Sequence, residues 1–232
     1  MTAALPGSSA TEGAGSLEVR WIFPGQLDAV VAGWFGRFPI GVDSREDSYL
    51  LDPDLRGLSV KVRAGAALEV KVYGGSPGIL DVRGRACGRI QSWQKWSFPF
   101  SPLRPGGDPA GWRPVGKRRL ITWFSLNSGQ SVAGTARPTG QPGCAVELTE
   151  VSMGGQAWWS LGFEATGPAS LLRSGLETTA VLVFAQALPG VEFAMDNSRS
   201  YAEWLSRRQG EPAVTPPGRQ RDDHRQQEAS FC

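Results

Sequence analysis

The sequence predicts an α+β fold dominated by β-strands: an eight-stranded antiparallel tunnel-like barrel, or a curved sheet, with a few packing helices. About eight segments alternate polar and apolar residues with the period of a strand. The 232 residues include 30 glycines and 17 prolines, which favours a turn-rich β fold over a helical bundle. A closed sheet also suits these strands, because it leaves no edge to protect.

The amino-terminal part of the chain predicts a leader, a strand, a helix and a second strand. Residues 1–15 are small and polar, which predicts a disordered leader. Residues 16–23 alternate as a strand. Residues 26–38 carry apolar residues at spacings of three and four, which predicts an amphipathic helix that ends near Pro39. Residues 44–51 form the next predicted strand.

A hairpin follows, and its polar face carries basic residues. Residues 58–63 and 67–73 each alternate apolar and polar side chains, and a short glycine-containing connection joins them. Lys61 and Arg63 share one face of the first strand, and Lys71 lies on the polar face of the second. These three cations can converge on one surface. That surface is either a solvated outer face or an inward-facing anion site, and spacing alone does not choose between the two.

The second half of the chain predicts more strands and two helices. Strands are expected at residues 79–83, 88–98, 115–124, 144–151 and 156–164. Residues 125–143 are expected to be a loop, and residues 168–188 and 199–208 to be helices. The folded domain is therefore predicted to span residues 16–206. Residues 207–232 are expected to form a disordered tail because of their composition.

Composition excludes several classes of function. The net charge is +2, with 24 basic and 22 acidic residues, so no global field favours nucleic acid or an acidic membrane surface. The three cysteines, Cys87, Cys144 and Cys232, have no metal-binding or disulfide spacing. The single histidine, His224, lies in the predicted tail, which argues against His-based catalysis within the domain.

The sequence contains no secretory signal pattern and no apolar run of membrane-spanning length. We therefore expect a cytoplasmic protein without a nucleic-acid or membrane partner. The sequence leaves the oligomeric state open.

Several short motifs occur in an order that resembles a known superfamily. They are Ser16-Leu-Glu-Val-Arg20, Asp47-Ser-Tyr49, Asp52, Lys61-Val-Arg63, Lys71, a later basic strand and Phe163-Glu164. Together they are similar to the CYTH, or triphosphate tunnel metalloenzyme, superfamily. That superfamily includes class IV adenylyl cyclases, thiamine triphosphatases and inorganic triphosphatases. The similarity covers residues 16–206, and the chain resembles a divergent member.

The resemblance implies a tunnel whose basic residues bind a triphosphate and whose carboxylates bind Mg²⁺ or Mn²⁺. The phosphate-binding candidates are Arg20, Lys61, Arg63, Lys71, Arg83 and, on the later basic strand, Lys117 or Arg119. The acidic candidates are Glu18, Glu164 and either Glu147 or Glu150. In an active enzyme, Glu18 and Glu164 would be catalytic. The metal ligands would be Glu18, Glu150 and Glu164.

The chain also departs from the family's pattern. Ser16 and Gly162 stand where the family has acids, and Arg20 stands where it has a lysine. Two lost carboxylates weaken a site for a divalent cation, whereas the basic residues are largely retained. The sequence therefore favours a domain that binds a phosphorylated or polyphosphate anion, an anionic small molecule, with weak or no catalysis.

Two alternatives remain open. One is a Mg²⁺- or Mn²⁺-dependent triphosphatase that hydrolyses a phosphoanhydride. The other is a scaffold or interaction domain whose tunnel is filled by aromatic side chains. The candidates for filling it are Trp21, Trp93, Trp96, Trp123, Trp158 and Trp159.

Overall fold

The computed structural model describes residues 14–208, apart from residues 53, 56, 100–110, 126–131 and 136–140. The predicted leader up to residue 13, and the predicted tail from residue 209, lie outside the described residues. The elements are, in order, β1 (Ala14–Pro24), α1 (Ala29–Phe35), β2 (Gly41–Leu50), β3 (Leu58–Arg63), β4 (Ala67–Val82), β5 (Ala86–Pro99), β6 (Trp112–Ser125), β7 (Val132–Gly134), β8 (Gly143–Met153), β9 (Gln156–Thr166), α2 (Ala169–Val183), a 3₁₀ turn (Met195–Asn197) and α3 (Tyr201–Ser206).

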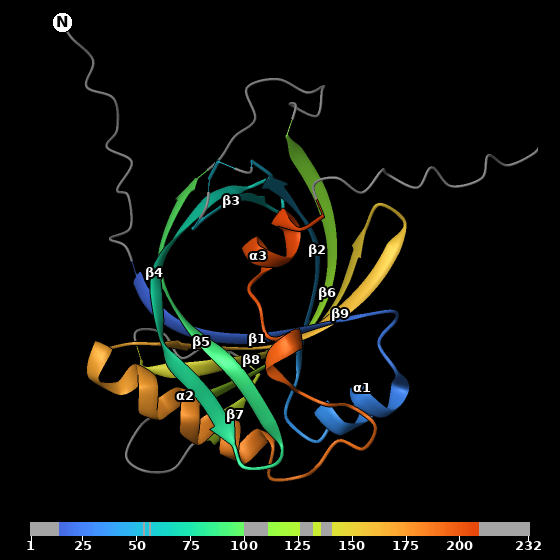
Figure 1. The fold of residues 1–232 in the computed structure, drawn as a ribbon, viewed down its shortest axis with the longest axis vertical. Coiled ribbons are helices and arrows are strands. Elements are labelled where there is room, and N and C mark those ends of the chain that lie inside the picture. Colours follow the sequence, from blue (N-terminus) through green and yellow to red (C-terminus); the bar gives the residue numbers. More distant parts are fainter. Residues whose placement is uncertain are drawn as a thin grey trace, which may run out of the picture.

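Eight strands close into an antiparallel barrel, which confirms the predicted fold class. Neighbouring strands follow the order β2, β3, β4, β5, β1, β9, β8, β6, and β6 pairs again with β2 to complete the ring. The ring is visible in Figure 1. The short β7 pairs with the end of β6. Because the ring is closed, successive residues of each strand face alternately the interior and the outside.

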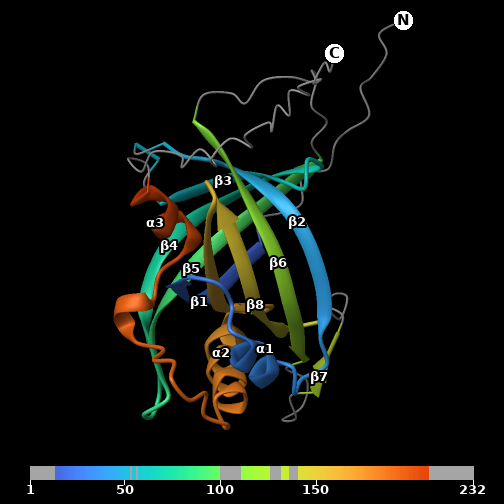
Figure 2. The same cartoon turned by 90° about the vertical axis from the view of Figure 1, so that its right-hand side faces the viewer.

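The outer faces of the β1, β8 and β9 strands form a hydrophobic core with α1 and α2. On β1, Val19 and Trp21 are buried in this core, while Glu18 and Arg20 face the interior. The Trp21 ring packs edge-on against three phenylalanine rings, including Phe163 of β9. Both helices lie outside the barrel, below the ring of strands in Figures 1 and 2. None of the described helices has the length and apolar composition needed to cross a membrane.

A second, smaller core lies inside one mouth of the barrel. The C-terminal helix α3 begins with a capping box formed by Ser200 and Glu203. Its Trp204 and Leu205 form a cluster with inward-facing residues of five strands, among them Trp158 of β9. Figure 1 shows α3 lying across the ring of strands. The helix therefore covers this mouth of the barrel.

Two strand predictions differ from the structure. Residues 67–73 and 79–83 were expected to form separate strands, but both belong to β4, which continues through a bulge. Gly75 and Gly78 have φ values of 107° and 137°, so glycine allows the bulge without ending the strand pairing. The three residues of β7 lie in a segment that was expected to be a loop.

Candidate functional site

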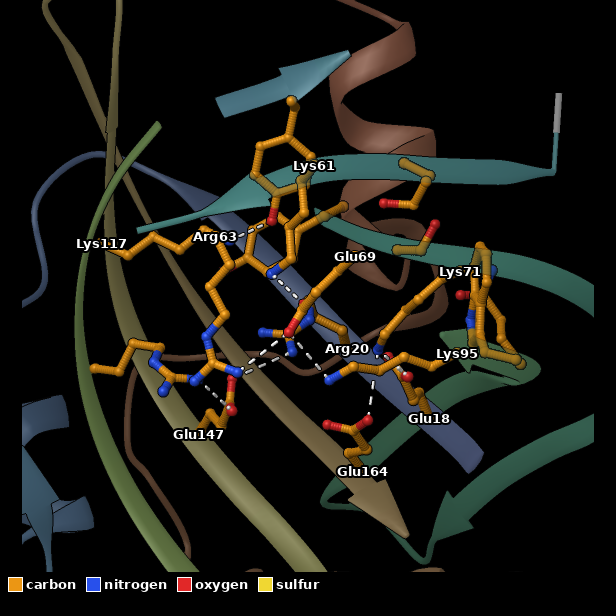
Figure 3. Close-up of a pocket in the computed structure, with 18 of the residues that line it drawn as sticks. Glu18, Arg20, Lys61, Arg63, Glu69, Lys71, Lys95, Lys117, Glu147 and Glu164 are labelled. Carbon is orange, nitrogen blue, oxygen red and sulfur yellow. Dashed lines mark hydrogen bonds and ion pairs between the residues drawn. The ribbon is translucent and has the colours of Figure 1, made fainter. Parts of the chain in front are cut away.

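The interior of the barrel contains a cavity of about 360 Å³, within the usual range for small-molecule sites. Among the described residues, eight cationic side chains and four carboxylates line it. The cations are Arg20, Arg45, Lys61, Arg63, Lys71, Lys95, Lys117 and Arg119, and the carboxylates are Glu18, Glu69, Glu147 and Glu164. Figure 3 shows most of them pointing toward the common space from different strands.

Strand register brings these groups together. Lys71 of β4 lies directly opposite Lys95 of β5, and Glu69 lies opposite Lys61 of β3. The side chains of directly opposite residues on neighbouring strands point to the same face of the sheet. Two charged residues in such a pair therefore both face the interior and lie side by side. The predicted convergence of Lys61, Arg63 and Lys71 is confirmed, and their shared surface faces the interior.

Glu69 binds three cations at once. Its carboxylate lies 3.2 Å from the Lys61 ammonium, 3.2 Å from the Arg63 guanidinium and 3.4 Å from the Lys95 ammonium. Burial would raise the pKa of Glu69, but these cations outweigh burial and lower the pKa to about 2. Arg63 and Lys95 have side chains that are 41% and 30% exposed, so this part of the cavity is the more accessible.

Asp47 is the second shared carboxylate and is fully buried. It lies 2.9 Å from Arg45, 3.1 Å from Lys61 and 3.3 Å from Lys117. Burial opposes the charge on Asp47, but Lys61 and Lys117 hold its pKa well below the usual range. Burial lowers the pKa of Lys117, whose ammonium group also donates a hydrogen bond to the Tyr49 hydroxyl. The α3 side of the cavity therefore holds a compact, buried ionic cluster.

Glu147 occupies the middle of the wall and pairs with two arginines. Arg119 donates a 2.8 Å hydrogen bond to it, and the Arg20 guanidinium lies 3.6 Å away. Burial would raise the pKa of Glu147, but the two guanidinium groups lower it to about 2. Arg20 also donates to Ser160 and lies over the Tyr201 ring of α3, 4.5 Å from its centroid.

Lys71 lies between two carboxylates. Its ammonium group is 2.5 Å from Oε1 of Glu18 and 3.4 Å from Oε1 of Glu164. Burial alone would lower the pKa of Lys71, but Glu164 and Glu18 raise it above its ordinary value, so the lysine stays charged. The Lys71 ammonium in turn lowers the pKa of Glu164. Figure 3 shows the lysine nitrogen between the two acids.

The donor set does not fit the metal centre that the family resemblance implies. Among the described residues, no group of three carboxylate, cysteine or histidine side chains is placed to hold a metal ion. Glu18 and Glu164 contact the Lys71 ammonium, and Glu147 contacts the Arg119 guanidinium. A protein cation therefore stands where a divalent cation would have to bind these acids.

Most of the site residues named from the sequence line the cavity, but two do not. Arg83 is exposed in the turn between β4 and β5, at the far end of that hairpin from Lys71. Glu150 pairs with Arg118 on the outer face, where its side chain is 40% exposed. Residues three apart on a strand face opposite sides, so Glu147 and Glu150 cannot both face the interior. Of the two candidates, Glu147 lines the cavity, and Glu150, which was expected to be a metal ligand, does not.

Sequence reasoning missed several members of the site. Arg45 and Asp47 face the interior from β2, and Lys95 faces it from β5. A signal for the first two was present, because Asp43, Arg45, Asp47 and Tyr49 alternate along residues 41–50. Tyr201 belongs to α3 and enters the site only through tertiary structure.

The tryptophans do not fill the interior. Trp21 and Trp159 belong to the core outside the barrel, and Trp158 packs on α3. Trp93 and Trp123 line the cavity but leave its volume of about 360 Å³ open. A barrel plugged by indole rings is therefore not what the structure shows.

Comparison with known proteins adds little to this description. No protein-family model matches the chain, and no curated protein matches it. One matching solved structure is the S. pombe Pct1 RNA triphosphatase, with a TM-score of 0.39 and 11% identity over 75% of this chain and 82% of that chain. The same enzyme in complex with the Spt5 CTD matches with a TM-score of 0.35 and 11% identity over 76% and 82%. Similarity at this level carries no argument about function, so the function has to be argued from the cavity.

Proposed function

We propose that the barrel binds a phosphorylated or polyphosphate anion in its cavity, with no need for a divalent cation and with weak or no turnover. The observation that carries this proposal is an excess of cations over carboxylates: the eight described cations that line the cavity pair with six carboxylates. Glu69 and Asp47 each contact three cations, Asp43 and Glu147 contact two each, and Glu18 and Glu164 share Lys71. Buried positive charge without full compensation is unfavourable, so an anion that accepts hydrogen bonds from these groups would be stabilised.

The more accessible cations are the best candidates for direct contact with the ligand. Arg63 and Lys95 share Glu69 with Lys61, and their side chains are 41% and 30% exposed. The planar guanidinium of Arg63 can donate two parallel hydrogen bonds to phosphate oxygens. An anion bound here would add negative charge beside Arg63, Lys95 and Lys61, which now share the single carboxylate of Glu69.

Hydrolysis is the less favoured alternative, because the acids that it needs are already bound. Metal-assisted attack on a phosphoanhydride requires carboxylates that are free to hold the metal or to orient water. Glu18 and Glu164 instead share the Lys71 ammonium group. The retained cations suit ground-state binding of an anion, which needs no such carboxylates.

The test is calorimetric titration of the full chain with inorganic tripolyphosphate in EDTA, followed by titration with Mg²⁺ or Mn²⁺ present while phosphate release is measured. We expect binding in EDTA and a raised melting temperature, since the ligand binds the folded state. Arg63→Ala should weaken binding by about tenfold or more, as expected for a charge-assisted hydrogen bond. Arg118→Ala is the matched control, because Arg118 is a half-exposed arginine paired with one glutamate on the outer face.

Two results would count against the proposal. Absence of binding in EDTA at millimolar tripolyphosphate would mean that the inner charges are purely structural. Binding that requires Mn²⁺, with phosphate release that Glu164→Gln abolishes, would establish the triphosphatase instead.

A further inference from the structure

A second cavity opens beside the basic one, between α3 and the wall formed by β3, β4 and β5. Its volume is about 450 Å³, within the usual range for ligand sites. No described Lys or Arg lines it, whereas eight line the basic cavity. We call this space the aromatic annex, because its lining includes Leu51, Leu55 and Leu205 and the rings of Tyr73 and Trp93. It offers no cation to an anion and suits an uncharged ligand.

The Trp93 indole is the clearest sign that the annex takes a ligand. The residue is only 4% exposed, and its Nε1–H has no hydrogen-bond partner within the described part of the chain. A buried donor without an acceptor is unfavourable and is uncommon in folded proteins. The Tyr73 ring lies 5.2 Å from the Trp93 ring at an interplanar angle of 56°, and Tyr73 is 36% exposed. The missing partner is therefore an oxygen acceptor on a ligand that packs against two tilted aromatic rings.

A polyproline II segment has the chemistry that the annex lacks. Such a segment forms no internal hydrogen bonds, so its backbone carbonyl groups are free to accept one. Proline-rich segments dock in aromatic-lined grooves, where the proline rings pack against the aromatic side chains. The proline rings also fix much of the backbone conformation before binding, so little conformational entropy is lost. The annex therefore fits an uncharged proline-rich segment.

The chain itself carries such a segment just beyond α3. Residues 209–218 read QGEPAVTPPG, with three prolines between positions 212 and 217 and no Lys or Arg. Ser206, the last residue of α3, lines the annex, and Arg208 is the last residue that the structure describes. An extended residue spans at most about 3.6 Å, so Pro212 can lie anywhere within about 14 Å of Arg208. So short a connection gives the segment an effective concentration on the order of millimolar at the annex.

We propose that residues 212–217 dock in the aromatic annex of their own chain. A backbone carbonyl of the segment accepts the hydrogen bond of the Trp93 indole, and its proline rings pack against Trp93 and Tyr73. The inference is independent of the proposed function, because no cation of the basic cavity takes part. Trp93 also lines the basic cavity, so the docked segment lies beside that cavity.

The test follows the Trp93 indole N–H of the full chain by NMR, and Trp93→Phe assigns the signal by its loss. The proline variant combines Pro212→Ser, Pro216→Ser and Pro217→Ser, and the control variant of the same tail combines Gln220→Ser, Gln226→Ser and Gln227→Ser. In the proline variant we expect the signal to shift and its exchange with solvent to become about tenfold faster or more, because the donor loses its acceptor. The control variant should leave the signal and its exchange unchanged.

A peptide added to the proline variant tests the place of docking. A synthetic peptide of residues 209–219, at about 1–5 mM, should restore the wild-type position of the Trp93 signal. The peptide should fail to restore it when Tyr73→Ala is combined with the proline variant. Val72→Ala in the same background is the control, because Val72 is as exposed as Tyr73 but lines neither cavity.

Three results would overturn the inference. An identical Trp93 signal in the wild-type protein and the proline variant would mean that the segment does not occupy the annex. Restoration of the signal in the Tyr73→Ala background would place the peptide elsewhere. A shift of the wild-type signal on addition of an unrelated proline-rich peptide would show that the annex is open in the full chain and belongs to a separate partner. Each of these results leaves the proposed function standing, since titration with tripolyphosphate tests it separately.

Discussion

The guanidinium group of Arg20 covers the α-carbon of Gly162 on the neighbouring strand: a β-carbon at residue 162 would lie 2.5 Å from Cζ of Arg20. The family resemblance places a lysine at the first position and an acid at the second. The two departures are therefore one local rearrangement, in which a larger cation occupies the space that a side chain at residue 162 would need. A carboxylate at residue 162 is sterically incompatible with Arg20 in its present position.

The first prediction concerns this contact. Gly162→Ala should destabilise the protein by about 1–3 kcal/mol, because the new methyl group forces the buried Arg20 out of its position. Urea denaturation measures the change. Gly15→Ala is the matched control, since Gly15 lies on β1, next to β9 in the same sheet, and its β-carbon would meet nothing within 4 Å. Arg20→Lys should offset part of the loss in the double variant, and a wild-type free energy of unfolding for Gly162→Ala would contradict the prediction.

Strand alternation predicted a barrel or a curved sheet, and together with the family resemblance it named most of the charges that line the cavity. Lys61, Arg63 and Lys71 share one surface as their spacing predicts, because period two is a local property of the chain. Which face was inward could not be derived from spacing alone. That choice depends on closure of the ring and on the helices that cover the outer faces of β1, β8 and β9.

The remaining features depend on contacts between segments that are distant in sequence. Glu147 and Glu150 were equivalent candidates until the pairing of β6 with β8 fixed their faces. The role of Lys71 depends on Glu18 and Glu164, which lie 53 and 93 residues away in the chain. Tyr201 reaches the cavity only because α3 folds back across the mouth of the barrel. No local pattern encodes these three relationships.

The second prediction concerns α3. Trp204→Ala should destabilise the protein by about 3–5 kcal/mol, because it leaves a void among the buried side chains at the mouth of the barrel. Trp204→Phe should cost far less, since the Trp204 indole N–H has no hydrogen-bond partner in the described residues and only ring volume is reduced. Thermal denaturation of both variants measures the difference. If the two variants lose equal stability, the volume of the ring at residue 204 does not determine how firmly α3 packs in the mouth of the barrel.

The third prediction concerns acid sensitivity. Glu69 and Glu147 have pKa values near 2 in the folded protein, below their ordinary value of 4.5. A carboxyl group with a depressed pKa adds stability above its unfolded pKa, and that stability is lost as the pH falls through its folded pKa. We therefore expect the free energy of unfolding to be level above about pH 5 and to fall between about pH 4.5 and 2, by at most about 3 kcal/mol per carboxyl.

Urea denaturation across this pH range tests the acid sensitivity. Glu147→Gln should be less stable at pH 7 and should lose less stability on acidification. The exposed Glu150 supplies the control, and Glu150→Gln should leave the pH profile unchanged. If the free energy of unfolding of the wild-type protein stays constant down to pH 2, the ion pairs of Glu69 and Glu147 do not stabilise the fold.

The fourth prediction concerns the lysine that separates Glu18 from Glu164. In Lys71→Met the two carboxylates lose the cation that they share, and their mutual repulsion makes a divalent cation a favourable replacement. We expect the variant to be about 3–5 kcal/mol less stable without metal, as for other broken buried ion pairs. Millimolar Mn²⁺ should then raise its melting temperature, while the wild-type melting temperature should not respond.

Lys95→Met is the control for the fourth prediction, because it removes a neighbouring cation of the same strand pair and leaves Lys71 with both of its carboxylates. It should lose affinity for tripolyphosphate but show no response to Mn²⁺. Stabilisation of the wild-type protein by Mn²⁺ in the absence of an anion would show that the acids can release Lys71 for a metal. The divalent cation would then belong to the site after all, because a fixed ammonium group and a bound metal ion compete for the same two carboxylates.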